Sequence, residues 1–212
     1  MGIRMGVIGA GVIGKLHTQV AKRHGVEVVA VADVNEQAAK VLAAAEDIPN
    51  VETDPQQVFD RDDIDAVAVC VPNKFHKDLA VAAMQAGKDV LLEKPMAMNA
   101  GECDEINAVA GKTGRILQMG FVYRYGPASQ TARAFLDAGR VGEIYHAKAT
   151  LYRRRGIPGL GGWFTTRAIS GGGPLIDIGV HAIDQVLYLM DFPIPRRVSG
   201  KVYCNFGKRM GD

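Results

Sequence analysis

The chain has 212 residues, which is one large domain or a domain and a half at the usual domain size of roughly 150. Lysine and arginine number 25 and aspartate and glutamate 23, so the net charge of +2 argues against a nucleic-acid binder that relies on bulk charge. The three cysteines are odd in number and far apart, which predicts neither disulfides nor a metal site. No apolar run approaches ~18 residues and no export signal precedes Ile8. We therefore expect a cytoplasmic protein with no membrane partner.

Short β-branched runs alternate with segments of helical period through the first ~120 residues, a pattern typical of βαβ units in an α/β fold. The predicted strands are residues 3–8, 26–32, 65–71, 89–92 and 115–119. The predicted helices are residues 12–24, 36–45, 75–86 and 100–111, and the first has an apolar stripe at Ile13, Leu16 and Val20. Since crossover connections are right-handed, we expect a doubly wound parallel sheet of the Rossmann type.

The pattern changes after Gly120, and we expect a dinucleotide-binding domain over residues 1–122 and a partial C-terminal domain over 123–212. In this second part we predict helices at 127–138 and 174–190 and strands at 143–152 and 197–206. Two strands and one long helix bury little apolar area. We therefore expect an incomplete α/β or α+β domain whose open sheet edge pairs with another copy of the chain.

A glycine turn of the form G-x-G-x-x-G follows the first predicted strand and opens the first predicted helix. In this context Gly9 permits a tight turn, Gly11 leaves room for a pyrophosphate, and Gly14 lets the helix pack closely on the strand. The helix then begins at Val12 and Ile13, where free N–H groups favour an anion. A glycine turn without a nucleotide is the alternative interpretation.

Asp33 ends the second predicted strand, about 20 residues beyond the glycines, where a carboxylate can accept hydrogen bonds from both ribose hydroxyls of a dinucleotide. The same carboxylate would repel a 2′-phosphate, and neither Val34 nor Asn35 supplies a cation to offset it. The sequence therefore favours NAD over NADP. An Asp that only caps the next helix is the alternative.

Two further motifs carry a family resemblance. Glu93-Lys94-Pro95 ends the predicted strand 89–92, and a glycine-rich segment at 171–184 contains Asp177 and His181. In order and spacing these motifs, together with Pro72, Asn73, His76, Gly87, Gly120, Arg124 and Pro127, resemble the glucose-fructose oxidoreductase, inositol dehydrogenase and rhizopine-catabolism (Gfo/Idh/MocA) family over residues 3–190.

This resemblance implies an NAD(P)-dependent oxidoreductase of sugars or polyols, with a Rossmann domain followed by an α/β domain on a large open sheet. It implies that Lys94, Asp177 and His181 form the catalytic group. It also implies a cis peptide bond between Lys94 and Pro95. A bond that precedes proline is the only common place for a cis peptide. Family members continue for about another domain beyond the second motif, so the resemblance implies either a truncated chain or a shortened second domain that another subunit completes.

The chemistry of alcohol oxidation fits these residue types. A base must remove the hydroxyl proton while a cation stabilises the developing alkoxide, roles that suit His181 and Lys94 respectively. Asp177 lies four residues before His181 on the predicted helix, where it either holds substrate or orients the imidazole. Lys94 is an alternative base. Each residue also has a purely structural interpretation. Lys94 could be a surface lysine, Asp177 an acid that complements the helix dipole, and His181 a packed histidine of the core.

We assign cofactor binding to Gly9, Gly11, Val12, Ile13, Gly14, Asp33, Pro72, Asn73, His76, Glu93 and Lys94. We assign substrate binding to Lys94, Arg124, Trp163, Asp177 and His181. His76 has a second interpretation as a helix cap, and Trp163 as an anchor of its loop. His17, His24 and His146 receive no role.

The sequence thus predicts a dehydrogenase that transfers hydride between NAD and a secondary hydroxyl of a sugar or cyclic polyol, working as a homo-oligomer. A non-catalytic nucleotide-binding or regulatory protein on the same scaffold, or an inactive fragment, is the alternative.

Overall fold

A computed structural model describes residues 2–152 and 161–203 of the chain. Its central feature is a six-stranded sheet in the order β3-β2-β1-β4-β5-β6, and every pairing is parallel. The strands are β1 (Arg4–Ile8), β2 (Glu27–Ala32), β3 (Asn50–Glu52), β4 (Ala66–Val69), β5 (Asp89–Leu92) and β6 (Leu117–Met119). The order reverses between β1 and β4, where doubly wound sheets bind ligands beyond the strand ends. The predicted Rossmann-type α/β fold is confirmed.

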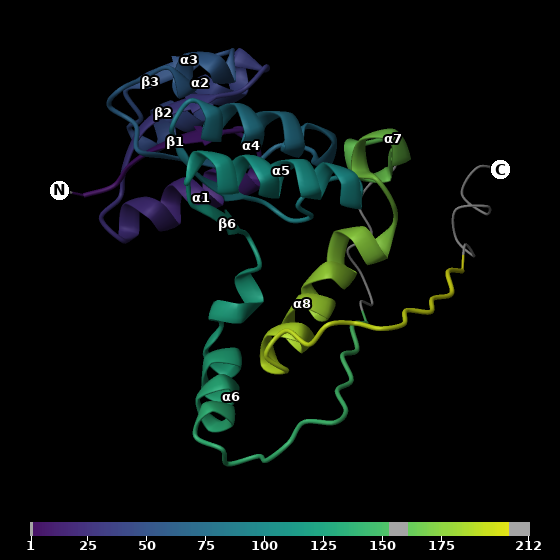
Figure 1. Cartoon of the computed structure of the whole chain (residues 1–212). Helices are drawn as coiled ribbons and strands as arrows, with labels where there is room; N and C mark the ends of the chain where they lie inside the picture. Colours follow the sequence, from purple (N-terminus) through teal and green to yellow (C-terminus); the bar gives the residue numbers. More distant parts are fainter. Residues whose placement is uncertain (1, 153–160, 204–212) are drawn as a thin grey trace.

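Helices cover both faces of this sheet, which explains why its strands are almost continuously apolar. On one face α1 (Val12–Arg23) and α2 (Glu36–Glu46) pack, with Leu42 and Val31 in that core. On the other face lie α3 (Pro55–Phe59), α4 (His76–Gln85) and α5 (Ala100–Thr113), around Phe59, Met84 and Ile106. Figure 1 shows α4 and α5 side by side over the sheet. None of the helices in the described ranges is long and apolar enough to cross a membrane.

The apolar stripe predicted on α1 does not face the core. Ile13, Leu16 and Val20 are 42%, 53% and 43% exposed, whereas Gly14 and Thr18 are the buried positions of this helix. Small side chains occupy the sheet side because the helix approaches the sheet closely there, and the Thr18 hydroxyl donates to the Gly14 carbonyl oxygen. The apolar period therefore identified the helix but not its buried face.

Two short elements, β3 and α3, were not predicted. β3 has only three residues, which is too few to show an alternating pattern. α3 begins with signals that the sequence does contain: Asp54 caps it by accepting a hydrogen bond from the Gln56 amide, and Pro55 occupies its first turn. β3 extends the sheet beyond β2 as its edge strand, and α3 follows β3 in the chain.

Beyond the sheet, Figure 1 shows β6 leading to a helical part that contains α6 and α8. Its elements are the 3₁₀ turn η2 (Val122–Tyr125), α6 (Pro127–Asp137), the 3₁₀ turn η3 (Trp163–Thr165), α7 (Arg167–Ser170), the π turn η4 (Leu175–Gly179) and α8 (Val180–Leu189). The predicted helix at 127–138 is confirmed. The predicted helix at 174–190 is present, but it opens with a π turn rather than an α-helical turn.

The two strands predicted in this part are wrong as far as the structure describes them. Residues 143–152 and 197–203 have no regular secondary structure, and residues 204–206 of the second prediction lie outside the described residues. A strand needs a hydrogen-bonded neighbour to satisfy its backbone groups, and the described ranges give neither segment one. Alternating polarity alone was therefore not enough evidence for a strand.

Candidate active site

The glycine turn between β1 and α1 has the geometry that its sequence predicts. Gly9 has φ = +100°, and a Cβ there would lie 2.4 Å from the Cys70 carbonyl oxygen. A Cβ on Gly14 would lie 1.8 Å from the Gly9 carbonyl oxygen, so neither position accepts a side chain. By contrast, nothing lies within 4 Å of a Cβ on Gly11. The turn thus leaves open space at the start of α1, where unpaired N–H groups favour a phosphate.

Asp33 closes the other end of this region and is held by the backbone. Its Oδ2 accepts a hydrogen bond of 2.7 Å from the Ala10 amide, and its Oδ1 accepts one of 2.8 Å from the Asn35 amide. Each carboxylate oxygen has a second lone pair, so both remain able to accept from ribose hydroxyls. Asn35 itself caps α2 through the Ala38 amide and supplies no positive charge.

Both ends border one cavity of 550 Å³, which we call the cofactor cleft. Its lining comprises Ile8, Gly9, Gly11, Val12, Ile13, Ala32, Asp33, Val34, Pro55, Cys70, Val71, Pro72, Phe75, Asp78, Leu79, Trp163 and Phe164. The two charged residues in this lining, Asp33 and Asp78, are both acids. Trp163 and Phe164 come from η3 and stack on each other with ring centroids 3.9 Å apart. Trp163, which we assigned to substrate, therefore lies against the cofactor cleft.

Lys94 and Asp177, 83 residues apart in the chain, are in direct contact. The Lys94 ammonium donates to Asp177 Oδ1 at 3.0 Å and to the Asp177 backbone carbonyl oxygen at 2.7 Å. The side chains are 18% and 31% exposed, so water still reaches the pair. Lys94 follows β5, and the peptide bond between it and Pro95 is cis, as predicted. Two motifs from separate parts of the fold thus meet at the carboxyl edge of the sheet.

His181 lies in the first turn of α8, and only 9% of its surface is exposed. Its ring stacks on Tyr123 with centroids 4.7 Å apart and meets the edge of Phe121 at 6.2 Å. Neither ring nitrogen has a hydrogen-bond partner within the described part of the chain, and Nδ1 is fully buried. Aromatic packing, rather than a hydrogen bond from the imidazole to Asp177, therefore holds the ring. This arrangement supports the interpretation in which Asp177 acts on substrate and Lys94.

Burial and the neighbouring Lys94 favour the neutral form of the His181 imidazole. Burial lowers the pKa of His181, and the positive charge of Lys94 lowers it further. The carboxylates of Glu93, Asp177 and Asp184 act in the opposite direction but do not reverse the shift. A neutral imidazole with unpaired nitrogens is able to accept a proton at neutral pH.

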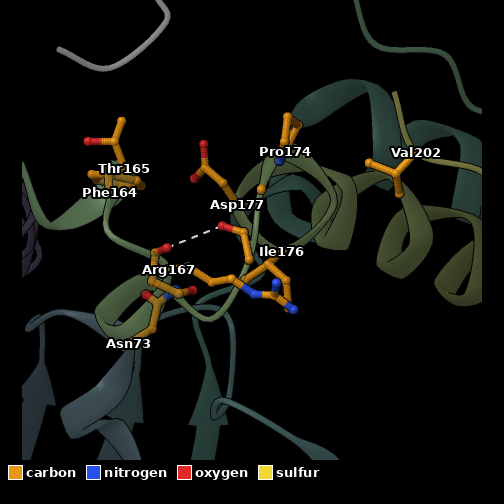
Figure 2. A pocket seen from close by; sticks show the side chains of 11 residues that line it. Asn73, Phe164, Thr165, Arg167, Pro174, Ile176, Asp177 and Val202 are labelled. Carbon is orange, nitrogen blue, oxygen red and sulfur yellow. Dashed lines mark hydrogen bonds between the residues drawn. The ribbon is translucent and has the colours of Figure 1, made fainter. Parts of the chain in front are cut away.

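A second cavity, of 590 Å³, lies beside Asp177, and we call it the substrate cavity (Figure 2). Its lining comprises Asn73, Phe164, Thr165, Arg167, Ser170, Gly172, Gly173, Pro174, Ile176, Asp177 and Val202. In Figure 2 the Asp177 carboxylate lies between Thr165 and Pro174, and Arg167 is the cation of the lining. Phe164 lines both cavities, so the cofactor cleft and the substrate cavity share a wall.

His76 and Asn73, both assigned to cofactor binding, are buried between loops. The His76 ring lies between the carbonyl oxygens of Pro95 and Val71, at 2.6 and 2.9 Å, and burial lowers its pKa. The Asn73 side chain donates to the Ser170 carbonyl oxygen at 2.8 Å. Since His76 is 0% exposed and Asn73 5%, the geometry supports a role in joining the loops that border the cavities.

Arg124, assigned to substrate, is paired with Asp184 of α8. Its Nε lies 2.9 and 3.1 Å from the two carboxylate oxygens, and Nη2 also contacts Oδ1. The guanidinium lies over the rings of Phe121, Tyr188 and Phe192, with 5.0 to 5.9 Å to their centroids. The structure therefore uses Arg124 to fix α8 against η2 and does not present it to the substrate cavity.

Sequence reasoning missed the partner of Glu93. Glu93 Oε1 accepts a 2.7 Å hydrogen bond from Nε2 of His17, a histidine to which we assigned no role. The available signal was positional, since His17 lies one helical turn after the glycine turn and Glu93 directly follows β5. Both therefore belong to the carboxyl edge of the sheet, where ligands of this fold bind.

Comparison with known proteins places this site in context. Residues 3–121 match the model of an oxidoreductase family with an NAD-binding Rossmann fold, named GFO_IDH_MocA. Residues 129–210 match the model of a GFO/IDH/MocA C-terminal domain.

Among curated relatives, the chain is 37% identical over 207 residues to D-glucoside 3-dehydrogenase of Escherichia coli (strain K12), covering 97% of this chain and 59% of that protein. It is 33% identical over 200 residues to inositol 2-dehydrogenase 1 of Saccharopolyspora erythraea, covering 92% of this chain and 57% of that protein. A solved structure of levoglucosan dehydrogenase with NADH and levoglucosan is similar at a TM-score of 0.78 and 26% identity, covering 89% of this chain and 54% of the other. The chain thus spans a little over half the length of these relatives.

Proposed function

The chain belongs to the Gfo/Idh/MocA family of oxidoreductases. We propose that it acts as an NAD-dependent dehydrogenase on a secondary hydroxyl of a sugar or cyclic polyol. The observation that carries this proposal is the contact between Lys94 and Asp177 beside a neutral His181. It brings a cation and a carboxylate together near a base, and the carboxylate belongs to the lining of the substrate cavity.

The cofactor cleft fits NAD on the geometry of this chain. The open space above Gly11 and the start of α1 would hold the pyrophosphate, and Asp33 would hold the adenosine ribose. An acidic lining favours a cofactor without a 2′-phosphate. When bound, NAD supplies the hydride acceptor for alcohol oxidation.

The residues of the chain divide the remaining work. His181 accepts the hydroxyl proton of the substrate, because its imidazole is neutral and unpaired. The Lys94 ammonium stabilises the negative charge that develops on that oxygen. Asp177 fixes Lys94 and accepts hydrogen bonds from neighbouring hydroxyls of the substrate. Lys94 remains the alternative base in this scheme.

The relatives named above act on cyclic polyhydroxylated compounds, and the substrate cavity suits that class. Asp177 and Thr165 are polar groups able to bind hydroxyls, while Phe164 and Ile176 offer apolar surface to a ring. We assign the domains to residues 1–122 and 123–212. Exposed apolar residues near α8, Leu175 and Ile183 at 61% and 50%, support self-association of the second domain.

The test is to incubate the purified chain with NAD and a panel of glucosides, anhydrosugars and inositols, and to follow the absorbance of reduced nicotinamide. Oxidation of one class that disappears in the variant Lys94→Ala supports the proposal. NADH binding can be followed separately by energy transfer from Trp163, the single tryptophan of the chain, which lines the cofactor cleft. Binding of NADH with no turnover of any compound would favour the non-catalytic alternative.

A further inference from the structure

His17 and Glu93 form a shielded hydrogen-bonded pair that the proposed mechanism does not use. Nε2 of His17 lies 2.7 Å from Oε1 of Glu93, and the two side chains are 17% and 14% exposed. His17 lies on α1, the helix that follows the glycine turn. Glu93 directly precedes Lys94 in the chain. The pair therefore connects the cofactor side of the sheet edge to the catalytic lysine.

The surrounding backbone is shaped around the Glu93 carboxylate. A Cβ on Gly120 would lie 2.9 Å from Glu93 Oε1, so this position must be glycine if the carboxylate is to stay where it is. The Gly120 amide donates to the Leu92 carbonyl oxygen at 2.7 Å, which fixes the glycine against the strand end. On its other side, Oε2 of Glu93 accepts a 3.2 Å hydrogen bond from the backbone amide of Lys94. The carboxylate is thus held at both oxygens.

The charge of Glu93 reaches the catalytic group. Burial opposes ionisation of Glu93, but the hydrogen bond and charge of His17, together with the backbone amide and the charge of Lys94, outweigh it, so the pKa of Glu93 lies below its usual value. The resulting anion acts on His181 against the positive charge of Lys94.

We propose that His17 is a positioning residue of the active site, which holds the Glu93 carboxylate against the backbone of Lys94, the catalytic lysine. The competing explanation is that the pair only fastens α1 to the sheet. The two explanations differ in whether His181 responds when His17 is changed. The proposal uses His181 as the proposed function does, but its test needs no turnover.

The decisive measurement is the NMR titration of the His181 imidazole in the full chain. The chain has five histidines, and the variant His181→Ala identifies the resonance that belongs to this one. In Glu93→Gln the loss of the anion should lower the titration midpoint of His181 by about half a pH unit or more. His17→Ala should also move this midpoint, because the carboxylate loses the donor that fixes it. The double variant should shift no further than Glu93→Gln alone.

The groups that remain around His181 are the same in all these variants: Lys94, Asp177 and Asp184, with the rings of Phe121 and Tyr123 packed against it. His17→Gln serves as the conservative variant, since its side-chain amide can donate to Glu93 from about the position of Nε2. It should return the midpoint toward that of the unmodified chain. This variant also keeps the test usable if His17→Ala fails to fold.

A matched control lies on the same helix. The Gln19 amide donates to Glu46 at 2.7 Å and fastens α1 to the end of α2, away from Lys94. Gln19→Ala should lower the thermal midpoint without moving the His181 titration. If His17→Ala and His17→Gln likewise lower only the thermal midpoint, the pair is structural and the proposal is overturned. If His181 shifts as expected but no sugar is oxidised, the proposed function fails and this inference stands.

Discussion

The preference for NAD can be tested most sharply at Asp33. Replacing Asp33 with Ala removes the carboxylate that borders the adenosine end of the cofactor cleft, and Asp33→Asn removes the charge while keeping one acceptor. In the structure this carboxylate already holds the Ala10 and Asn35 amides, so it is preorganised to receive two more donors. Both variants should weaken NADH, and Asp33→Ala should do so more strongly.

The magnitude follows from two hydrogen bonds to a charged group. At about 1.5 kcal/mol each, the lower end for such bonds, their loss costs about 3 kcal/mol, or roughly 100-fold in the dissociation constant. NADPH makes only one of these bonds, and it carries a phosphate of charge about −2. Unit charges about 4 Å apart in water repel by about 1 kcal/mol, so removing the carboxylate relieves about 2 kcal/mol. NADPH affinity should therefore change little, and the preference for NADH should fall by about 100-fold.

Energy transfer from Trp163 measures both dissociation constants on the same protein, because Trp163 lines the cleft and Asp33→Ala leaves it in place. Raising the salt concentration should reduce the preference of the unmodified chain but not that of Asp33→Asn, since only a charge is screened. Tighter binding of NADPH by the unmodified chain would refute the reasoning. An equal loss for both cofactors in Asp33→Ala would show that the variant disturbs the glycine turn instead.

Three further results are expected. His181→Ala should lower kcat by about 10²- to 10⁴-fold and remove the acidic limb of the pH profile. In the unmodified chain, burial and Lys94 lower the pKa of His181, so this limb should lie below the usual histidine pKa of about 6.5. Activity should be lost as the pH falls through it. A limb that survives in His181→Ala but vanishes in Lys94→Ala would make the lysine the base. Asp184→Asn should destabilise α8 by about 3 kcal/mol in urea unfolding, the lower end for breaking a buried pair, since Arg124 is 24% exposed; an unchanged unfolding midpoint would contradict this. Trp163→Ala should weaken NADH about tenfold by calorimetry, while Trp163→Phe retains most of the affinity; equal losses would show that ring stacking is not what matters.

The Rossmann sheet was predictable because its evidence is local. The five predicted strands of the central sheet are short, largely apolar runs, and the turn at Gly9 carries its signal within six residues. The contact between Lys94 and Asp177 was predictable only through the motif order, since 83 residues separate them. By contrast, the strand at 143–152 depended on polarity alternation alone, and no neighbouring strand in the described ranges pairs with it.

At several site residues the structure shows contacts that the sequence does not indicate, and these contacts share a physical feature. Arg124, His76 and His17 are polar groups whose partners come from other elements, so their roles depend on tertiary contacts that no local pattern encodes. A guanidinium opposite Asp184 and one facing a substrate look alike in sequence. Residue type predicted that Arg124 and His76 would be engaged, but it assigned no role to His17, and only the fold determines the partner of each group.

The two cavities owe their relative position to few contacts. Asn73 reaches the Ser170 carbonyl oxygen, Lys94 reaches Asp177, and Phe164 forms the wall that the cavities share. A typical hydrogen bond contributes only about 1 kcal/mol net, so these links fix geometry without adding much stability. A displacement of about 1 Å at a reacting group can cost 100-fold in rate, far more than its effect on folding. Substitutions at Asn73, Lys94 or Phe164, which lie along the boundary between the cavities, should therefore reduce turnover while the chain remains folded. On this reasoning, the rate of the proposed reaction depends on the boundary and not on either cavity alone.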